Sequence, residues 1–424
     1  MSRRVVVTGI GVVSPNGVGV PAFLDAIQNG TSGIKFMPLY EELNFSCRVA
    51  GKPDFIWEDL KKYISEVTFH GLKGTNIGYG ITAAMDAWAD AGFEYDTDEP
   101  RWDTGCIFGN SVADTEAMKN VITKVDNKEV RKLGSRVVEQ AMNSGVTSYI
   151  SGRLGLGGMI TTNSSACATG TQAIMMGYDQ IKWGASKRML VGSSEYVDPY
   201  VYGAFDSMRV LSRKFNDQPE RASRPMSATA GGFVPGSGAA ALILEDLDYA
   251  LDRGARIYAE ILGASSNSGG QRGGGSMTAP NPAGVMKSVT DAVTAAGIDP
   301  DQIDLISGHL TATMADKYEI QNWTKALNRS GKNFPLINSL KSMIGHCLSA
   351  AGSIESVAAI LQINHNFAHP NINIEDPNPG ILELIDEGCI PLTAVKKDIN
   401  ILAKANFGFG DVNTCLIFSK FNNK

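Results

Sequence analysis

The sequence lacks the features of membrane and disulfide-stabilised proteins. No apolar run reaches the length of about 18 residues that a spanning helix needs, so we expect no membrane span. The charged start is followed by an apolar run that breaks at Thr8-Gly9, too early for a signal peptide. The six cysteines have no paired spacing, which argues against disulfides or a zinc site and favours reduced thiols in the cytoplasm.

Positive charge is not in excess either. The formal net charge is −6 and 19% of the residues are charged, so nothing points to nucleic acid or an anionic membrane surface as a partner. The 43% of hydrophobic residues and the 46 glycines describe a globular protein with many tight turns. At 424 residues the chain can hold one large core or two domains.

Strand-like and helix-like segments alternate along the chain. Apolar segments predicted as strands lie at residues 5–8, 106–108, 189–192, 239–245, 304–308 and 400–408. Helical patterns cover residues 77–92 and the segment from residue 171, and a second series of strands and helices begins near residue 256. The alternation predicts an α/β fold with a mainly parallel sheet covered on both faces. No internal repeat is visible by residue identity.

Glycines follow the first strand in the motif Gly9-Ile-Gly11, which predicts a turn. A Gly-x-Gly after a strand can also hold a dinucleotide phosphate. Here no third glycine follows at the required place and no acidic residue closes a βαβ unit, so we expect no nucleotide.

One cysteine lies in a motif typical of a nucleophile. The segment Asn163-Ser-Ser-Ala-Cys167-Ala-Thr-Gly170 separates a short apolar run from a helical pattern. A strand-to-helix turn would expose Cys167 to the partial positive charge of a helix N-terminus, which favours the thiolate. Small neighbours let a substrate carbonyl approach, so Cys167 is a candidate nucleophile for acyl transfer. A buried structural cysteine is the alternative.

Two of the five histidines lie where α/β folds place reactive groups. His309 ends an apolar strand, and His346 lies where a loop enters a helix. Lys341, five residues before His346, is a candidate charge partner. The alternatives are hydrogen-bonded structural histidines and a solvated surface lysine.

Together these segments resemble the signature blocks of the β-ketoacyl-acyl carrier protein synthases, most closely the elongating Cys-His-His type that type II polyketide systems also use. The resemblance runs from Arg4–Pro15 to the block Asn406-Phe-Gly-Phe-Gly410, and further matching blocks are Leu211–Pro225, Gly254–Ile261 and Met277–Pro280. It implies a thiolase-like, duplicated five-layer αβαβα fold. The N-terminal half (1–255) would carry the cysteine and the C-terminal half (256–424) both histidines.

The resemblance also implies roles for the catalytic residues. Cys167 would hold the acyl group as a thioester, while His309 and His346 donate Nε2–H bonds to the thioester carbonyl of malonyl-carrier. The backbone N–H groups of Cys167 and Phe409 would form a second oxyanion site. Lys341 would orient the histidines.

Further residues are carried over as supporting groups. Glu319 resembles the ion-pair partner of Lys341, with a helix-surface carboxylate as the alternative. Phe407 and Phe409 would form the wall and gate of the acyl pocket, unless they are simple core residues. The phosphopantetheine arm would hydrogen-bond to Thr311 and Thr313. The carrier protein would contact three basic residues, namely Arg213, Lys214 and Lys73.

The same resemblance implies that no metal or nucleotide cofactor is needed, because the substrates arrive on the phosphopantetheine of an acyl carrier protein. The expected assembly is a homodimer, or a heterodimer with a related ketosynthase or chain-length subunit. Three alternatives remain open, namely a non-catalytic chain-length factor, a thiolase-type acyltransferase and a purely structural protein. The intact cysteine, histidines and lysine argue against the first and the last.

The chain departs from the family pattern in three places. The stretch Ser227–Phe233 lacks three charged residues that the family has there, as if an ion-pair network had been removed as a unit. Leu310 replaces a glycine and Met314 a proline, and Asp411-Val-Asn413 replaces Gly-Thr-Asn. We therefore hypothesise a specialised polyketide or polyene synthase, with ordinary fatty-acid synthesis as the alternative. Leu310 is tolerable only with a negative φ and free volume around it.

Overall fold

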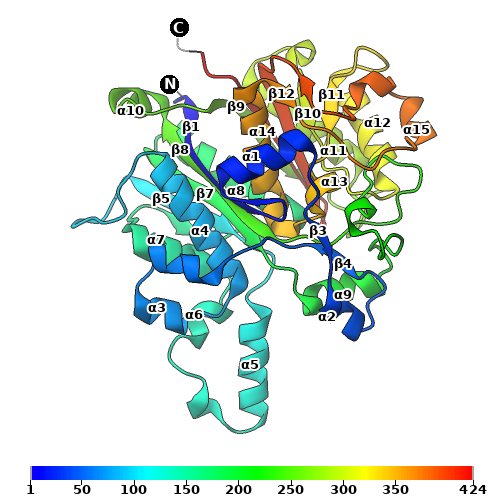
Figure 1. Cartoon of the computed structure of the whole chain (residues 1–424). Coiled ribbons are helices and arrows are strands. Elements are labelled where there is room, and N and C mark those ends of the chain that lie inside the picture. The colour runs from blue at the N-terminus through cyan, green and yellow to red at the C-terminus, as the bar shows by residue number, and fades with distance from the viewer. Residues whose placement is uncertain (1, 423–424) are drawn as a thin grey trace.

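The computed structural model describes residues 2–422. A mixed β-sheet forms its spine, with the strand order β11-β10-β14-β15-β9-β1-β8-β7-β5-β6 and the short β2 (Gly17–Val18) paired to β1 (Figure 1). The N-terminal half supplies β1 (Val5–Ser14), β5 (Thr104–Gly109), β6 (Ile160–Thr161), β7 (Arg188–Glu195) and β8 (Gly238–Asp246). The C-terminal half supplies β9 (Ala259–Ser268), β10 (Leu305–Ser307), β11 (Leu336–Asn338), β14 (Ile401–Gly408) and β15 (Val412–Ser419).

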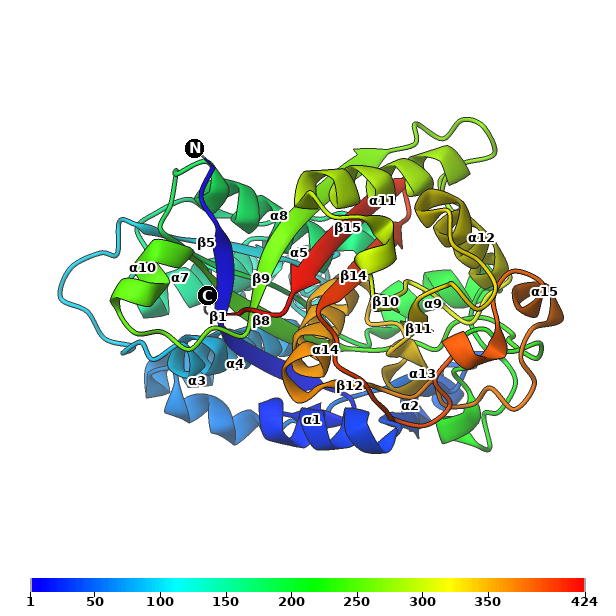
Figure 2. The same cartoon turned by 90° about the horizontal axis from the view of Figure 1, so that it is seen from above.

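Helices complete five layers. In the middle, α8 (Thr169–Lys182) packs against α14 (Ala351–His365), and both helices contact strands of the two halves. On the outside, α4 (Thr75–Asp90) covers β1 and β8, while α11 (Pro282–Ala296) covers β9 and β15 (Figure 2). The predicted thiolase-like αβαβα fold is confirmed.

The remaining helices lie around these layers and at their edges. They are α1 (Val20–Asn29), α2 (Pro38–Glu42), α3 (Glu66–Gly71), α5 (Thr115–Asp126), α6 (Val137–Ala141), α7 (Gly145–Leu154), α9 (Pro199–Ser207), α10 (Leu247–Asp252), α12 (Ala315–Leu327), α13 (Lys341–Ile344) and α15 (Pro379–Leu382). Two further strand pairs are β3 (Ile34–Phe36) with β4 (Val49–Gly51) and β12 (Phe367–Ala368) with β13 (Val395–Lys396).

The two halves repeat one topology. The order β6-β5-β7-β8-β1 matches β11-β10-β14-β15-β9, and each series begins with two parallel pairs and continues with two antiparallel pairs. A 3₁₀ turn precedes the central helix in each half, namely Ala166–Ala168 before α8 and Leu348–Ala350 before α14. Both turns open on a residue with positive φ, 48° at Ala166 and 40° at Leu348. The duplication is therefore visible in the backbone although residue identity hides it.

Two local predictions from the sequence are wrong. The sheet is mixed rather than mainly parallel, because β1, β8, β9 and β15 pair antiparallel in its centre. The Gly9-Ile-Gly11 motif is no turn, since β1 runs straight through it to Ser14. Its glycines serve close packing instead, because a Cβ on Gly11 would overlap the carbonyl oxygen of Ala83 on α4.

Candidate active site

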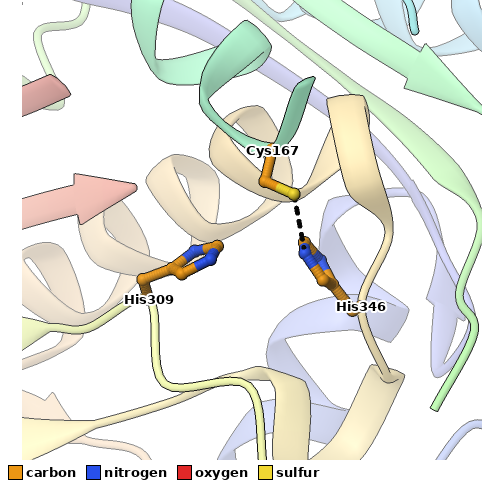
Figure 3. Close-up of side chains that lie close together, drawn as sticks. All are labelled: Cys167, His309 and His346. Carbon is orange, nitrogen blue, oxygen red and sulfur yellow. Dashed lines mark hydrogen bonds between the residues drawn. The ribbon is translucent and has the colours of Figure 1, made fainter. Parts of the chain in front are cut away.

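Three side chains from distant segments meet beneath the start of α8. The Sγ atom of Cys167 lies 3.1 Å from Nε2 of His346, and the ring centroids of His309 and His346 are 5.4 Å apart (Figure 3). One ligand-type atom from each of the three residues lies within 4.8 Å of the others. The structure thus brings together the cysteine and both histidines that the sequence singled out.

The turn around Cys167 is held by its own side chains. The hydroxyl of Thr169 accepts the backbone N–H of Ser165 at 2.7 Å and donates to the carbonyl of Ala166 at 2.7 Å. Gly170 allows the starts of α8 and α14 to touch, because a Cβ there would lie 2.5 Å from the backbone nitrogen of Ser353. These contacts place Cys167 just before the N-terminus of α8, as the sequence predicts.

The electrostatics of Cys167 differ from the prediction. Burial raises the pKa of its thiol to about 12, although Lys341 and the backbone N–H of Phe409 act in the opposite direction. Burial also lowers the pKa of His346 to about 3, assisted by Lys341. The resting pair is therefore a thiol beside a neutral imidazole, and the helix N-terminus alone does not produce a thiolate.

His309 follows directly after β10 and is half-buried. Both oxygens of Glu319 on α12 accept backbone N–H groups, from His309 at 2.7 Å and from Leu310 at 2.7 Å. Burial lowers the pKa of His309 well below its ordinary value, with Lys341 contributing next. Glu319 thus fixes the backbone that presents a neutral histidine.

The proposed ion pair between Lys341 and Glu319 is wrong. Lys341 on α13 pairs with Glu355 on α14, and both side chains are fully buried. Glu355 also binds a second buried lysine, Lys404 on β14, at 2.7 Å. Sequence reasoning missed Glu355 and Lys404, although a lysine inside an apolar strand is an unusual signal for a buried charge.

The hairpin between β14 and β15 brings the two phenylalanines to the site. The ring of Phe407 is buried and its centroid lies 5.9 Å from that of His309. Phe409 is at the tip of the turn, half-buried, with its ring 5.9 Å from that of Phe205. Gly408 permits this approach, since a Cβ there would lie 2.6 Å from the carbonyl oxygen of Ser165.

The supporting residues lie near the site or on the surface. The hydroxyls of Thr311 and Thr313 are 3.1 Å apart in the half-buried loop after His309. Arg213 and Lys214 are exposed in the loop after α9, and Lys73 is exposed in the segment before α4.

The altered loops are well packed. The buried Arg224 forms ion pairs with Glu375 and Asp376, and Asp376 also accepts from the hydroxyl of Ser227 at 2.5 Å. Glu375 and Asp376, from another part of the chain, thus bind Arg224 and Ser227 at the stretch that lacks the family's charged residues. Leu310 is fully buried among apolar residues, and its φ is not positive, so the backbone condition stated for it is confirmed.

Comparisons with known proteins identify the family. The profile of the β-ketoacyl synthase N-terminal domain matches residues 2–250, and that of the C-terminal domain matches residues 258–375. The chain belongs to the β-ketoacyl synthase family. It is an acyltransferase of the 3-oxoacyl-acyl carrier protein synthase class.

Relatives from several branches align over nearly the whole chain. A Schizosaccharomyces pombe protein named as a mitochondrial 3-oxoacyl-acyl carrier protein synthase is 34% identical, with 99% of each chain covered. The 3-oxoacyl-acyl carrier protein synthase 2 of Vibrio harveyi is 33% identical over 99% of both chains. A Streptomyces cyaneus protein named as a polyketide β-ketoacyl synthase is 30% identical, covering 99% of this chain and 98% of its own.

Two solved structures show the same fold. One is a type II polyketide ketosynthase in complex with its acyl carrier protein and bound to a hexaketide, with a TM-score of 0.87, 29% identity, and 99% and 100% of the chains covered. The other is the ishigamide ketosynthase/chain length factor, with a TM-score of 0.88, 27% identity and 100% of both chains covered. Among residues 2–422, no helix combines the length and apolar character needed to cross a membrane.

Proposed function

We propose that Cys167, His309 and His346 carry out a decarboxylative Claisen condensation, in which an acyl group on Cys167 is extended by malonyl-acyl carrier protein. The observation that carries the proposal is their convergence, with Sγ 3.1 Å from Nε2 of His346. Lys341 is held by its buried pair with Glu355, and its charge helps to lower the pKa of both histidines.

In the first half-reaction, Cys167 takes the acyl group from its carrier. Nε2 of His346 holds the thiol proton as Sγ attacks the thioester carbonyl, and the proton then leaves on the carrier's phosphopantetheine thiol. The backbone N–H groups of Cys167 and Phe409 stabilise the oxyanion. The thiol requires this help because its pKa is raised to about 12 by burial.

In the second half-reaction, malonyl-carrier loses CO2. His309 and His346 donate Nε2–H bonds to the thioester oxygen as charge builds on it, and the resulting enolate attacks the carbonyl carbon on Cys167. The new C–C bond replaces the C–S bond to Cys167, whose sulfur leaves as a thiolate and takes up a proton from solvent, while the 3-oxoacyl chain stays on the carrier. In the described part of the chain, Nδ1 of His346 has no hydrogen-bond partner. That ring can therefore carry its proton on either nitrogen, which suits accepting in the first step and donating in the second.

The substrates define the partners. An acyl carrier protein delivers both the acyl and the malonyl group. Thr311 and Thr313 are candidate hydrogen-bond partners of its phosphopantetheine, and Arg213, Lys214 and Lys73 are candidate contacts for its acidic surface. The chemistry needs no metal, although the three-residue cluster has the ligand types and spacing of a metal site. We propose that the protein is cytoplasmic. We also propose that its two halves comprise residues 1–255 and 256–424.

A second chain completes the assembly, either an identical copy or a related ketosynthase or chain-length subunit. Edge strand β6 is exposed at Ile160, and α5 projects from the body with Met118, Ile122 and Val125 exposed along one face (Figure 1). An open strand edge and a row of exposed apolar side chains on a helix each favour association with another chain.

The pathway is fatty-acid synthesis or a specialised polyketide or polyene pathway. The ion pairs of Arg224 with Glu375 and Asp376 weaken the argument for specialisation from lost charges, since the network is filled from elsewhere. Competition between saturated, unsaturated and aryl acyl-carriers decides this point. Better turnover of medium saturated chains would place the protein in fatty-acid synthesis.

The catalytic assignment is tested by loading the purified protein with an acyl-carrier and digesting it for mass spectrometry. We expect the acyl mass on the peptide that contains Cys167. An acyl group on another cysteine, with Cys167 unmodified, would contradict the assignment.

A further inference from the structure

Strand β14 carries two buried polar side chains beside the catalytic cluster. Lys404 and Asn406 are both fully buried. Because residues two apart in a strand point to the same face, they lie side by side, toward Glu355 on α14. Neither forms a hydrogen bond with Cys167, so their burial calls for another explanation.

The amide of Asn406 has a defined orientation. Its Oδ1 accepts from the hydroxyl of Thr171, and its Nδ2 donates to Oε2 of Glu355 at 3.0 Å. The pKa of Glu355 is lowered to about 2 because Lys341 and Lys404 outweigh the effect of burial. An ionised carboxylate only accepts hydrogen bonds, so the nitrogen of the amide must face Glu355.

The second N–H of this amide points at a catalytic histidine. Nδ2 of Asn406 lies 3.2 Å from Nδ1 of His309. An amide nitrogen can only donate, so Nδ1 is the acceptor and the proton of the neutral ring lies on Nε2. This is the tautomer that can donate to a substrate oxygen.

Lys404 fixes the carboxylate on which this orientation depends. Its Nζ lies 2.7 Å from Oε2 of Glu355, 2.6 Å from the carbonyl oxygen of Ala405 and 3.5 Å from that of Ser307. Three acceptors for three N–H groups describe an ammonium ion. With Lys341 on the other oxygen, Glu355 is held from both sides and presents Oε2 to Asn406.

We propose that Asn406 and Lys404 are positioning residues for the malonyl half-reaction: Asn406 holds His309 in the Nε2–H tautomer, and Lys404 holds Glu355 so that Asn406 keeps its orientation. The proposal rests on the proposed role of His309 as an oxyanion donor. It predicts that loss of either residue slows decarboxylation and leaves acyl transfer to Cys167 intact.

The tautomer can be measured without any turnover. In protein labelled with ¹⁵N-histidine, with His309→Gln to assign the signal, we expect Nε2 of His309 protonated and Nδ1 unprotonated. Asn406→Leu removes the donor without adding a charge beside Glu355, so part of the proton population should move to Nδ1. A proton on Nδ1 in the unaltered protein, or no change in Asn406→Leu, would overturn the assignment.

The two half-reactions supply the functional readout. We expect Asn406→Leu to lower malonyl decarboxylation about a hundredfold, as for a lost oxyanion donor, and Lys404→Met to lower it about tenfold. Acylation of Cys167 should stay unchanged in both. Asn364→Leu is a matched control. Asn364 lies at the far end of α14, where its side-chain amide donates hydrogen bonds to the carbonyls of Tyr258 and Ile360, so its loss should alter neither step.

The outcomes separate this proposal from the proposed function. Equal loss of both half-reactions, or full decarboxylation by Asn406→Leu, would show that these residues only support the structure. Should the unaltered protein fail to acylate Cys167, the proposed function fails, while the tautomer of His309 still tests the role of Asn406. If a variant does not fold, the tautomer in the unaltered protein decides.

Discussion

At the scale of single residues, burial controls the chemistry of the site. The thiol of Cys167 and the imidazole of His346 are both neutral at rest, because burial raises the pKa of one and lowers that of the other. In the proposed mechanism, reactivity therefore depends on proton transfer within the pair during attack.

The first prediction concerns the alkylation of Cys167 by iodoacetamide in His346→Ala, a variant without the base that could take the thiol proton during attack. Since the pKa of the thiol is about 12, the thiolate fraction rises about tenfold for each pH unit below that value. We expect the alkylation rate to increase steadily from pH 6 to 10 without a plateau. A plateau above pH 7 would show a preformed thiolate and contradict the neutral pair.

The second prediction concerns the two lysines on one carboxylate. Glu355→Gln leaves Lys341 and Lys404 buried without a counter-charge, which should cost about 3–5 kcal/mol of unfolding free energy. Lys341→Met leaves a one-to-one pair and should cost clearly less. Urea unfolding measures the free energy of unfolding of both variants. A larger loss of this free energy in Lys341→Met than in Glu355→Gln would show that Glu355 needs both lysines.

The sequence predicts which side chains meet at the site better than it predicts their supports. The turns of Cys167, His309 and His346 also fit structural residues when taken singly, and the resemblance in the order of the blocks is what singles the three out. Glu319 was assigned to the wrong partner because ten residues of separation from His309 do not reveal where its carboxylate points. Asn406 and Lys404 reach Glu355 because β14 packs against α14, a long-range contact that no local pattern encodes.

At the scale of elements, backbone contact between helices and strands sets the layers. The alternation of strands and helices predicts the fold class, but the antiparallel centre of the sheet depends on how the two halves pair. The glycines of β1 illustrate the same limit, since their spacing fits a turn as well as a helix contact.

The third prediction tests that contact. Gly11→Ala places a Cβ against the carbonyl oxygen of Ala83 on α4 and should cost about 1–3 kcal/mol, as overpacking does. Gly152→Ala in α7 is the control, because no atom lies within 4 Å of the added Cβ and alanine favours helix. Thermal unfolding compares them, and equal stability of the two variants would contradict the packing role of Gly11.

At the scale of the whole molecule, the duplicated topology explains how the site is assembled. The starts of α8 and α14 meet in the central layer, so the turn of Cys167 in one half faces His346 in the other. Neither half holds the complete site. The duplication could not be predicted from residue identity because the two halves share topology rather than sequence.

The fourth prediction concerns association. We expect light scattering to give twice the chain mass of 45.2 kDa, and Ile122→Asp on the exposed face of α5 to shift the protein toward monomer. Leu382→Asp, at the end of α15 away from α5, is the control and should leave the mass unchanged (Figure 1). A monomeric unaltered protein would contradict the homodimer and leave a related subunit as the partner.

The central claim is the division of labour between the cysteine and the histidines, and separate assays of the two half-reactions test it most directly. Acyl transfer is followed by mass spectrometry on Cys167, and decarboxylation by CO2 release from malonyl-carrier. We predict that Cys167→Ala abolishes condensation but retains decarboxylation, and that His309→Ala still accepts the acyl group but loses decarboxylation by about a hundredfold or more. His346→Ala should be slowed in both half-reactions, because it loses the base for acyl transfer as well as an oxyanion donor. Full CO2 release by either histidine variant would contradict the account.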